Sequence, residues 1–183
     1  RRLLAYARKQ TATPRVLDLN ETVEGMLSML RRLIGENMEL VWQPGRNLGS
    51  VKIDPVQIDQ ILANLCVNAR DAIKGVGRVV IGTGMMNLPL GGVEHCEGLA
   101  PGEYIWITVT DNGCGMDAGV KEHLFEPYFT TKGLGKGTGL GLAMVYGIVR
   151  QNKGCIQVQS EPGRGTCIRI LLPRYVGSPV NMH

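Results

Sequence analysis

The chain has 183 residues, of which 44% are apolar and 20% are charged. These proportions are typical of one ordinary globular domain, and they argue against a disordered chain, a coiled coil or two full-sized domains. The net charge of +4 comes largely from basic residues at the N-terminus, and the few aromatic residues are not interleaved with them. Nucleic-acid binding is therefore not expected, because a single-strand binding surface combines both residue types.

The five cysteines are odd in number and include no Cys-x-x-Cys pair. This pattern predicts neither a disulfide framework nor a zinc site, and it favours reduced thiols in a cytoplasmic protein. No apolar run approaches the roughly 20 residues that cross a bilayer. We therefore expect no membrane contact by this chain, and the sequence is silent on whether a longer parent protein spans a membrane.

The first third of the chain is expected to alternate helices and short strands. Residues 1–11 have the pattern of a helix end, and Pro14 prevents the helix from continuing. A short strand follows at residues 16–19, and Asn20 is then expected to cap a helix whose apolar positions recur every three or four residues. Two more strands are predicted on either side of a Pro-Gly turn, at residues 38–42 and 51–53.

The rest of the chain contains two longer helices and two pairs of strands. The first helix begins after Asp54, a capping carboxylate followed by proline, and reaches about Ile73. The other predicted elements are strands at 78–86 and 103–110 around a loop at 88–102, a helix at 139–151, and a closing hairpin of 155–160 and 166–172. This order, with strand pairs in hairpins, predicts an α/β sandwich (α+β) whose helices pack on one face of a mixed, mostly antiparallel sheet.

Two asparagines lie on the helix that follows Asp54. Asn64 and Asn68 are about 40° apart around the helix, beside its apolar stripe, with Asp71 just beyond them. Amide carbonyls are hard oxygen ligands that suit magnesium, which is normally completed by waters and substrate phosphates. The alternative interpretation is a pair of solvated asparagines.

The strand at 103–110 leads into the sequence Asp-Asn-Gly-Cys-Gly-Met. Asp111 can accept a hydrogen bond from an adenine amino group, and Gly113 and Gly115 allow the backbone to approach the ring. A simple glycine-rich turn is the alternative. The segment also fits a dinucleotide fingerprint loosely, but no convincing strand-helix-strand unit follows it.

A second glycine-rich segment precedes the helix at 139–151. Glycines occupy every second position from Gly133 to Gly141. They lead into a helix whose free N-terminal amides can hold phosphate, and the spacing excludes a Walker loop. The stretch before them, 124–132, contains both phenylalanines, whose bulk can anchor a flexible lid.

Together these motifs resemble the catalytic domain of sensor histidine kinases. Residues 64–72 resemble the N box, 111–116 and 135–142 the two glycine boxes, and 125–132 the F box. They occur in the order found in the family, and the resemblance covers roughly residues 14–173. It implies the Bergerat ATP-binding fold, which is shared with gyrase, mismatch-repair and heat-shock chaperone ATPases.

The resemblance also implies ATP and Mg²⁺ as ligands. Asn64 and Asn68 match the metal-binding positions and, with Lys132, the catalytic ones, while Asp111 matches the adenine-binding aspartate. Thr166 resembles a position near adenine. The full set of ATP-binding positions implied is Asn64, Asn68, Asp71, Ala72, Asp111, Gly113, Gly115, Met116, Phe129, Thr131, Lys132, Gly137, Thr138, Gly139, Leu140, Gly141, Leu142 and Thr166.

The residue at position 64 separates branches of the family. Hydrolytic relatives have a glutamate base there, whereas an asparagine amide cannot take a proton from water. We therefore expect transfer of the γ-phosphoryl group to a histidine on an upstream domain that is not in this chain. An ATP-driven conformational machine, a non-catalytic nucleotide-binding module and a serine kinase for an anti-sigma partner remain alternatives.

The resemblance divides the chain into three parts. Residues 1–13 are expected to be the remnant of the upstream dimerisation and histidine-phosphotransfer helix, 14–175 the catalytic ATP-binding domain, and 176–183 a C-terminal tail. The implied partners are that histidine-phosphotransfer domain, through which the parent protein would form a homodimer, and the receiver domain of a response regulator.

Overall fold

The computed structural model describes residues 11–93, 95–126 and 141–177. The helix end predicted at residues 1–11 and most of the predicted C-terminal tail lie outside these ranges. The three-part division of the chain therefore stays a prediction.

The centre of the fold is a five-stranded sheet in the order β2-β4-β5-β7-β6. Only β2 and β4 are parallel, and every other neighbouring pair is antiparallel. The strands are β2 (Met38–Gln43), β4 (Gly77–Leu88), β5 (Gly102–Asp111), β6 (Cys155–Ser160) and β7 (Thr166–Pro173). The predicted mixed, mostly antiparallel sheet is thus confirmed.

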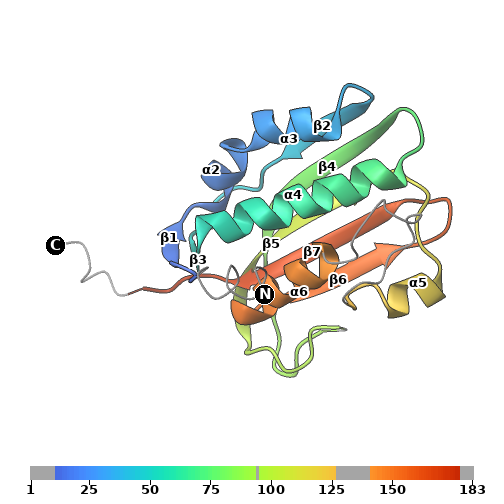
Figure 1. Cartoon of the computed structure of the whole chain (residues 1–183). Helices are drawn as coiled ribbons and strands as arrows, with labels where there is room; N and C mark the ends of the chain where they lie inside the picture. The colour runs from blue at the N-terminus through green and yellow to red at the C-terminus, as the bar shows by residue number, and fades with distance from the viewer. Residues whose placement is uncertain (1–10, 94, 127–140, 178–183) are drawn as a thin grey trace, which may run out of the picture.

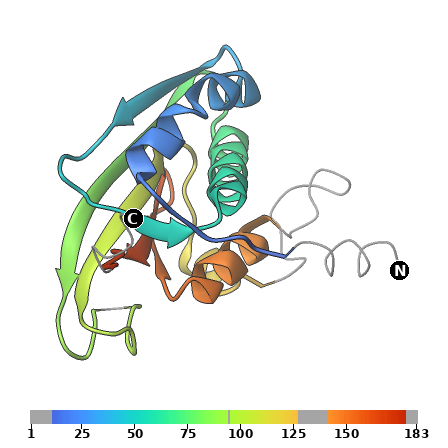
Figure 2. The same ribbon diagram turned by 90° about the vertical axis from the view of Figure 1, so that its left-hand side faces the viewer.

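Helices cover one face of this sheet, with α4 lying between α3 and α6 (Figures 1 and 2). The covering helices are α2 (Leu19–Glu24), α3 (Leu27–Ile34), α4 (Pro55–Ala72) and α6 (Gly141–Gln151). A short helix, α5 (Ala118–Glu122), lies near one edge of the sheet (Figure 1). This arrangement is the predicted two-layer α/β sandwich.

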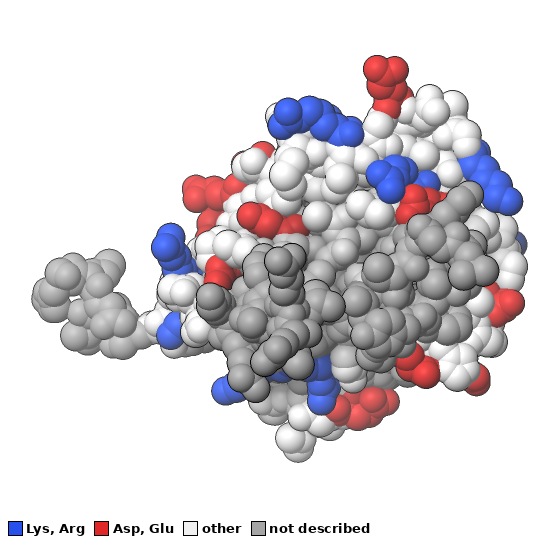
Figure 3. All heavy atoms as spheres, viewed as in Figure 1, with Lys and Arg blue, Asp and Glu red and all other residues white. Residues whose placement is uncertain are grey.

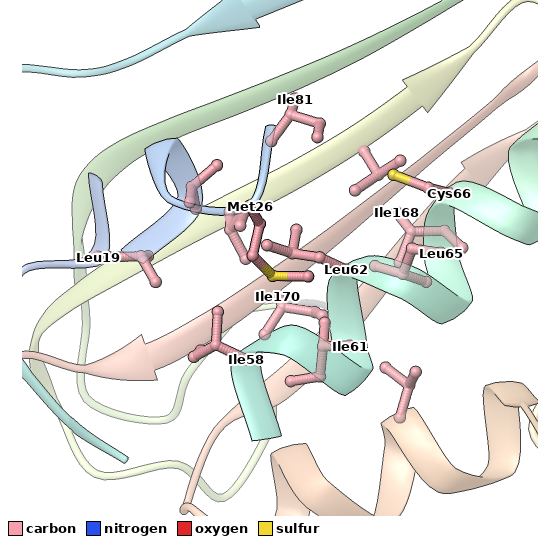
Figure 4. Close-up of a cluster of buried hydrophobic side chains, with 14 of the residues drawn as sticks. Leu19, Met26, Ile58, Ile61, Leu62, Leu65, Cys66, Ile81, Ile168 and Ile170 are labelled. Carbon is pink, nitrogen blue, oxygen red and sulfur yellow. The ribbon is translucent and has the colours of Figure 1, made fainter. Parts of the chain in front are cut away.

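The main core fills the space between the helices and the sheet (Figure 4). Alternate residues of each strand face it, and one apolar stripe of α4 meets them, as strand and helix periodicities require. The buried side chains of this contact include Ile58, Ile61, Leu62, Leu65, Ile81, Ile168 and Ile170. Burial of this apolar surface holds α4 in a fixed place above the strands.

The N-cap of the first helix lies two residues before the predicted one. Asp18 is the N-cap of α2 and accepts a hydrogen bond from the backbone N–H of Glu21. Asn20 instead joins two distant segments, since its amide donates to Gly45 O (2.9 Å) and accepts from the Thr83 hydroxyl (2.6 Å). The prediction of Asn20 as a cap was wrong because sequence spacing does not reveal this tertiary contact.

The two strands predicted around the Pro-Gly turn do not pair with each other. β2 joins the main sheet beside β4, whereas β3 (Val51–Ile53) pairs with β1 (Arg15–Leu17) in a separate two-stranded sheet. Strand pairing is decided by which buried faces meet, so proximity along the chain is only a weak guide to it.

The cysteine interpretation also requires correction, because Cys96 and Cys155 form a disulfide. They are 59 residues apart, one in the 88–102 loop and the other at the start of β6. Nothing in the sequence indicates that these two segments meet. Cys66, Cys114 and Cys167 are free.

Within the described ranges, no helix has the length and apolarity needed to cross a bilayer.

Candidate nucleotide site

The two predicted metal-binding asparagines are held on α4 by a well-defined helix start. Asp54 caps α4 by accepting from the Val56 N–H (2.9 Å), and Pro55 occupies the first turn. Asn64 and Asn68 lie one turn apart further along the helix, and both are half-buried. The Asn64 amide donates to Gln60 O (2.9 Å), whereas Asn68 Nδ2 is buried without a hydrogen-bond partner among the described residues. A buried amide nitrogen of this kind is what a bound ligand or water would satisfy.

Asp111 ends β5 and is only 8% exposed. Its Oδ1 accepts from the backbone N–H of Gly113 (2.8 Å). Desolvation raises the pKa of this carboxyl group, and hydrogen bonds from the N–H groups of Gly113 and Thr166 partly oppose the increase. Asp111, which was predicted to bind adenine, is therefore a buried hydrogen-bond acceptor held in place by the loop that follows it.

The loop after β5 packs so closely against the end of α4 and the turn of the closing hairpin that two of its positions require glycine. A Cβ at Gly113 would lie 2.5 Å from the carbonyl oxygen of Ala72, and one at Gly115 would collide with the carbonyl oxygen of Glu161. Gly115 also has φ +73, which favours glycine. Ala72 O additionally accepts from the Cys114 N–H (2.9 Å). Gly113 thus lets the loop contact the end of α4, and Gly115 lets it contact the turn of the closing hairpin.

Ser160 is a site residue that the sequence interpretation missed. Its hydroxyl donates to Gly165 O (2.9 Å), accepts from the Met116 N–H (2.8 Å) and lies 2.8 Å from the Thr166 hydroxyl. It therefore connects the closing hairpin to the glycine loop. In the hairpin, Ser160 and Thr166 are the facing pair next to the turn.

The phosphate motif reaches the metal-site helix at the start of α6. A Cβ at Gly141 would lie 3.1 Å from Asn64 Oδ1, so this glycine and the asparagine are close neighbours. Leu142 packs on the main core. Phe125, at the start of the F box, stacks on Tyr146 of α6 with ring centroids 5.3 Å apart. Phe125, the first residue of the F box, therefore contacts α6.

Several predicted ATP contacts lie outside the described residues: Phe129, Thr131, Lys132, Gly137, Thr138, Gly139 and Leu140. Among those described, the structure brings Asn64 to Gly141, Ala72 to Gly113, and Asp111 to Thr166. Asp71 is exposed near the end of α4, and Arg70 forms an ion pair with it (3.1 Å).

The described residues suit a nucleotide with a hard cation. The amide oxygens of Asn64 and Asn68 are appropriate magnesium ligands, and the unsatisfied Asn68 Nδ2 has the chemistry to donate to a phosphate oxygen. These two amides would hold magnesium only together with phosphate groups and water.

A cavity of about 680 Å³ touches the site without coinciding with it. It shares Asp111 and Thr166 with the predicted site, but most of its lining belongs to β6, β7 and Lys121. Neither Asn64 nor Asn68 lines it. The contacts among the motif residues therefore lie partly outside this cavity.

Residues 53–176 match the family described as Histidine kinase-, DNA gyrase B-, and HSP90-like ATPase. The chain belongs to this family, as the order of its motifs predicts. It is 45% identical over 178 residues to the Sensor kinase CckA of Brucella abortus (strain 2308), covering 96% of this chain and 19% of that protein. It is 34% identical over 158 residues to the Sensor histidine kinase ZraS of Escherichia coli (strain K12), covering 86% and 30%. The chain thus spans less than a third of either relative.

Solved histidine kinase structures have the same fold. The mycobacterial sensor histidine kinase MprB superposes with a TM-score of 0.67 at 22% identity, over 88% of this chain and 97% of that one. The catalytic domain of histidine kinase ThkA superposes with a TM-score of 0.67 at 24% identity, over 88% of this chain and 96% of that one. At these identities the likeness establishes the architecture alone, and it confirms the predicted fold.

Proposed function

We propose that this chain is the ATP-binding catalytic domain of a two-component sensor histidine kinase. It would transfer the γ-phosphoryl group of ATP to a histidine on a separate helical domain of the same protein. An aspartate on the receiver domain of a response regulator would then take the phosphoryl group. The parent would be a homodimeric protein with this domain in the cytoplasm.

The observation that supports this proposal most directly is the convergence of three motifs. Asp111, the Gly113 backbone and the end of α4 meet at one side, while Asn64 meets Gly141 at the other. The proposed acceptor for adenine, Asp111, and the proposed phosphate-binding segment at Gly141 would thereby both lie against α4, as the binding of one ATP molecule requires.

Each of these residues has a separate task in the proposed reaction. Asp111 accepts from the adenine amino group, and Gly113 and Gly115 leave room for the ring. Asn64 and Asn68 hold the metal and phosphates in place, and the amides at the start of α6 receive negative charge. Magnesium, when bound, would neutralise charge on the transferred phosphoryl group. The protein's contribution is mainly orientation and electrostatic stabilisation.

The surroundings of Asn64 favour transfer over hydrolysis. Its amide nitrogen is engaged by Gln60 O, and its oxygen lies toward Gly141. An amide has no basic site that could activate water, so ATP would persist until an acceptor histidine arrives. A gyrase- or chaperone-like ATPase is the second candidate, and sustained turnover by the isolated chain would favour it.

The face of the molecule that carries the helices shows acidic and basic side chains interspersed over its described part (Figure 3). A mixed surface of this kind is compatible with docking to another protein domain, and the proposed partner is the histidine-bearing hairpin of the parent.

The first test is calorimetric titration of the chain with ATP, with and without magnesium. Saturable binding without continuing heat is expected, followed by phosphorylation of a histidine when a histidine-phosphotransfer hairpin is supplied. Absence of binding would overturn both candidate functions.

The variant Asn68→Ala should lose the magnesium-dependent part of ATP affinity, at least about tenfold, because it removes an amide from the metal and phosphate site. Asn87→Ala is the matched control, since Asn87 is exposed on β4 outside the site. Equal affinities for both variants, with unchanged circular dichroism, would contradict the metal role of Asn68.

A further inference from the structure

The disulfide between Cys96 and Cys155 fixes a loop on the sheet face that the helices leave open. Its described residues are 89–93 and 95–101, and we call them the flap. The two Cα atoms are 5.8 Å apart, and both cysteines are at most 3% exposed. The bond therefore lies beneath the flap rather than on the molecular surface.

A small second core surrounds the disulfide. Leu88, Tyr104 and Leu171 are buried with the two cysteines, and Met86, Val93, Leu99 and Trp106 pack against them. The strand residues of this cluster alternate with residues that face the main core, so they project from the opposite side of the sheet. The flap thus covers an apolar patch that none of the described helices reaches.

Hydrogen bonds between near neighbours shape the turns of the flap. Gly92 donates to Pro89 O (3.0 Å) and Cys96 to Val93 O (2.8 Å), while the Tyr104 hydroxyl donates to Ala100 O (2.8 Å). The covalent connection from the flap to β6 is the disulfide. Its loss would leave the flap attached to that strand by non-covalent contacts alone, among them those of the second core.

We propose that Cys96 and Cys155 form a redox-responsive site that determines how firmly the flap is closed. A dithiol reductant would attack one sulfur to form a mixed disulfide, and its second thiol would then complete the exchange. The cystine gains two electrons and two protons to become two thiols, while the dithiol becomes a disulfide. A disulfide oxidant would reverse the step with the same balance.

The assignment of a switch, rather than a permanent staple, rests on the proposed cytoplasmic function. Disulfides in that compartment are commonly transient or redox-sensing. Both sulfurs are buried under the flap, so a thiol would reach them only in molecules whose flap has opened. Reduced cysteines behave as small apolar side chains, so the second core can remain partly assembled after reduction. Reduction would therefore shift the flap toward opening without unfolding the main core.

Opening of the flap would alter the neighbouring cavity. His95, next to Cys96, lines that cavity together with Arg169, whose guanidinium lies 5.2 Å from the centre of the Trp106 ring. Trp106 also packs on the second core. The Trp106 indole thus contacts the second core and a residue that lines the cavity, so its fluorescence should respond to movement of the flap.

The first experiment asks whether the bond exists in the whole purified chain. Alkylation and peptide mapping of air-oxidised protein should recover a linked peptide containing Cys96 and Cys155, with Cys114 and Cys167 labelled. Cys66 should stay unlabelled without denaturant, because burial raises the pKa of its thiol to about 12. Finding Cys96 and Cys155 both free would overturn the proposal.

The second experiment measures the flap by cleavage after Glu97 with a glutamate-specific protease. Cleavage should be at least about tenfold faster after treatment with dithiothreitol, and the fluorescence of Trp106 should change in a Trp42→Phe background. Cys155→Ser should be cleaved rapidly under both conditions, whereas Cys167→Ser should keep the redox difference. Equal cleavage rates, or a bond that resists excess dithiothreitol in the native protein, would overturn the switch.

These measurements involve no nucleotide. Failure to bind ATP with an intact redox response would remove the proposed kinase function alone, and normal ATP binding without a redox response would remove the switch alone.

Discussion

Asp111 combines burial with a negative charge, and these two properties oppose each other. Desolvation raises the pKa of its carboxyl group, while the N–H groups of Gly113 and Thr166 favour the ionised form. Between the ordinary value of 3.8 and the raised value, the native state binds more protons than the unfolded chain. The contribution of Asp111 to the free energy of unfolding therefore falls as pH rises from the ordinary pKa to the raised one. An ionised Asp111 thus costs the folded protein some stability.

The variant Asp111→Asn tests this trade-off. It removes the buried charge while its side-chain oxygen can still accept from Gly113, so the midpoint of thermal unfolding at pH 7 should stay level or rise. Affinity for ATP and ADP should fall by about tenfold or more, because a hydrogen bond to a charged acceptor is lost. Calorimetry and thermal denaturation of the same sample measure both effects. Parallel losses of stability and affinity would instead indicate misfolding.

Ser160 shows what residue-level interpretation overlooks. A lone serine at the end of a predicted strand has no chemical signature, yet its hydroxyl joins Met116, Gly165 and Thr166. Asn64, Asn68 and Asp111 were predictable because their residue types match metal and adenine chemistry at the right spacing. The bonding of Ser160 depends instead on three segments that meet only after folding.

At the scale of single elements, α4 is the part of the site that local sequence specifies best. The Asp-Pro start, the apolar stripe and the paired asparagines all lie within one continuous helix. Asp54 also accepts from the Thr13 N–H (2.8 Å), so it ties the chain before β1 to the start of α4. These hydrogen bonds, that of Thr13 foremost, lower the pKa of the Asp54 carboxyl group.

Replacing Asp54 with alanine should reduce the free energy of unfolding by about 1 kcal/mol at pH 7, the usual effect of losing a helix cap. Because the pKa of Asp54 is lowered in the folded protein, the ionised carboxylate stabilises the fold fully above the ordinary pKa of 3.8. This stabilisation disappears as the pH falls through the lowered pKa. Urea denaturation at pH 7 and near pH 3 should therefore give a larger difference at pH 7. Asp54→Asn, which can still cap, is the matched control, and a deficit that did not shrink at low pH would refute the ionic contribution.

The first helical segment illustrates the opposite case. Its apolar spacing predicted one helix, but α2 and α3 are separate, with Gly25 and Met26 between them. Val23 and Leu30 nevertheless remain fully buried. The periodicity located the buried face correctly, while packing over the sheet decided where the helix breaks.

At the scale of the whole molecule, one core supports both ends of the site. Leu62 is fully buried on α4, between the two layers that carry the asparagines and Asp111 (Figure 4). Leu62→Ala should lower the free energy of unfolding by roughly 2–5 kcal/mol through lost burial and cavity formation. Met29→Ala on α3, where the side chain is 43% exposed, should change it by less than about 1 kcal/mol. Similar losses for both variants in urea titrations would contradict this division between core and surface.

The sequence by itself determined most of the elements, the two-layer class and the family, because these follow from periodicity, capping residues and motifs read over short stretches. It did not show α5 or the break between α2 and α3. Only the tertiary structure decided that β2 lies parallel to β4, that β1 pairs with β3, and that Cys96 meets Cys155. Each of those contacts joins segments whose local sequence contains no mark of the partner. Burial of surface in two separate cores selects among the alternative pairings, and that selection depends on the whole chain at once.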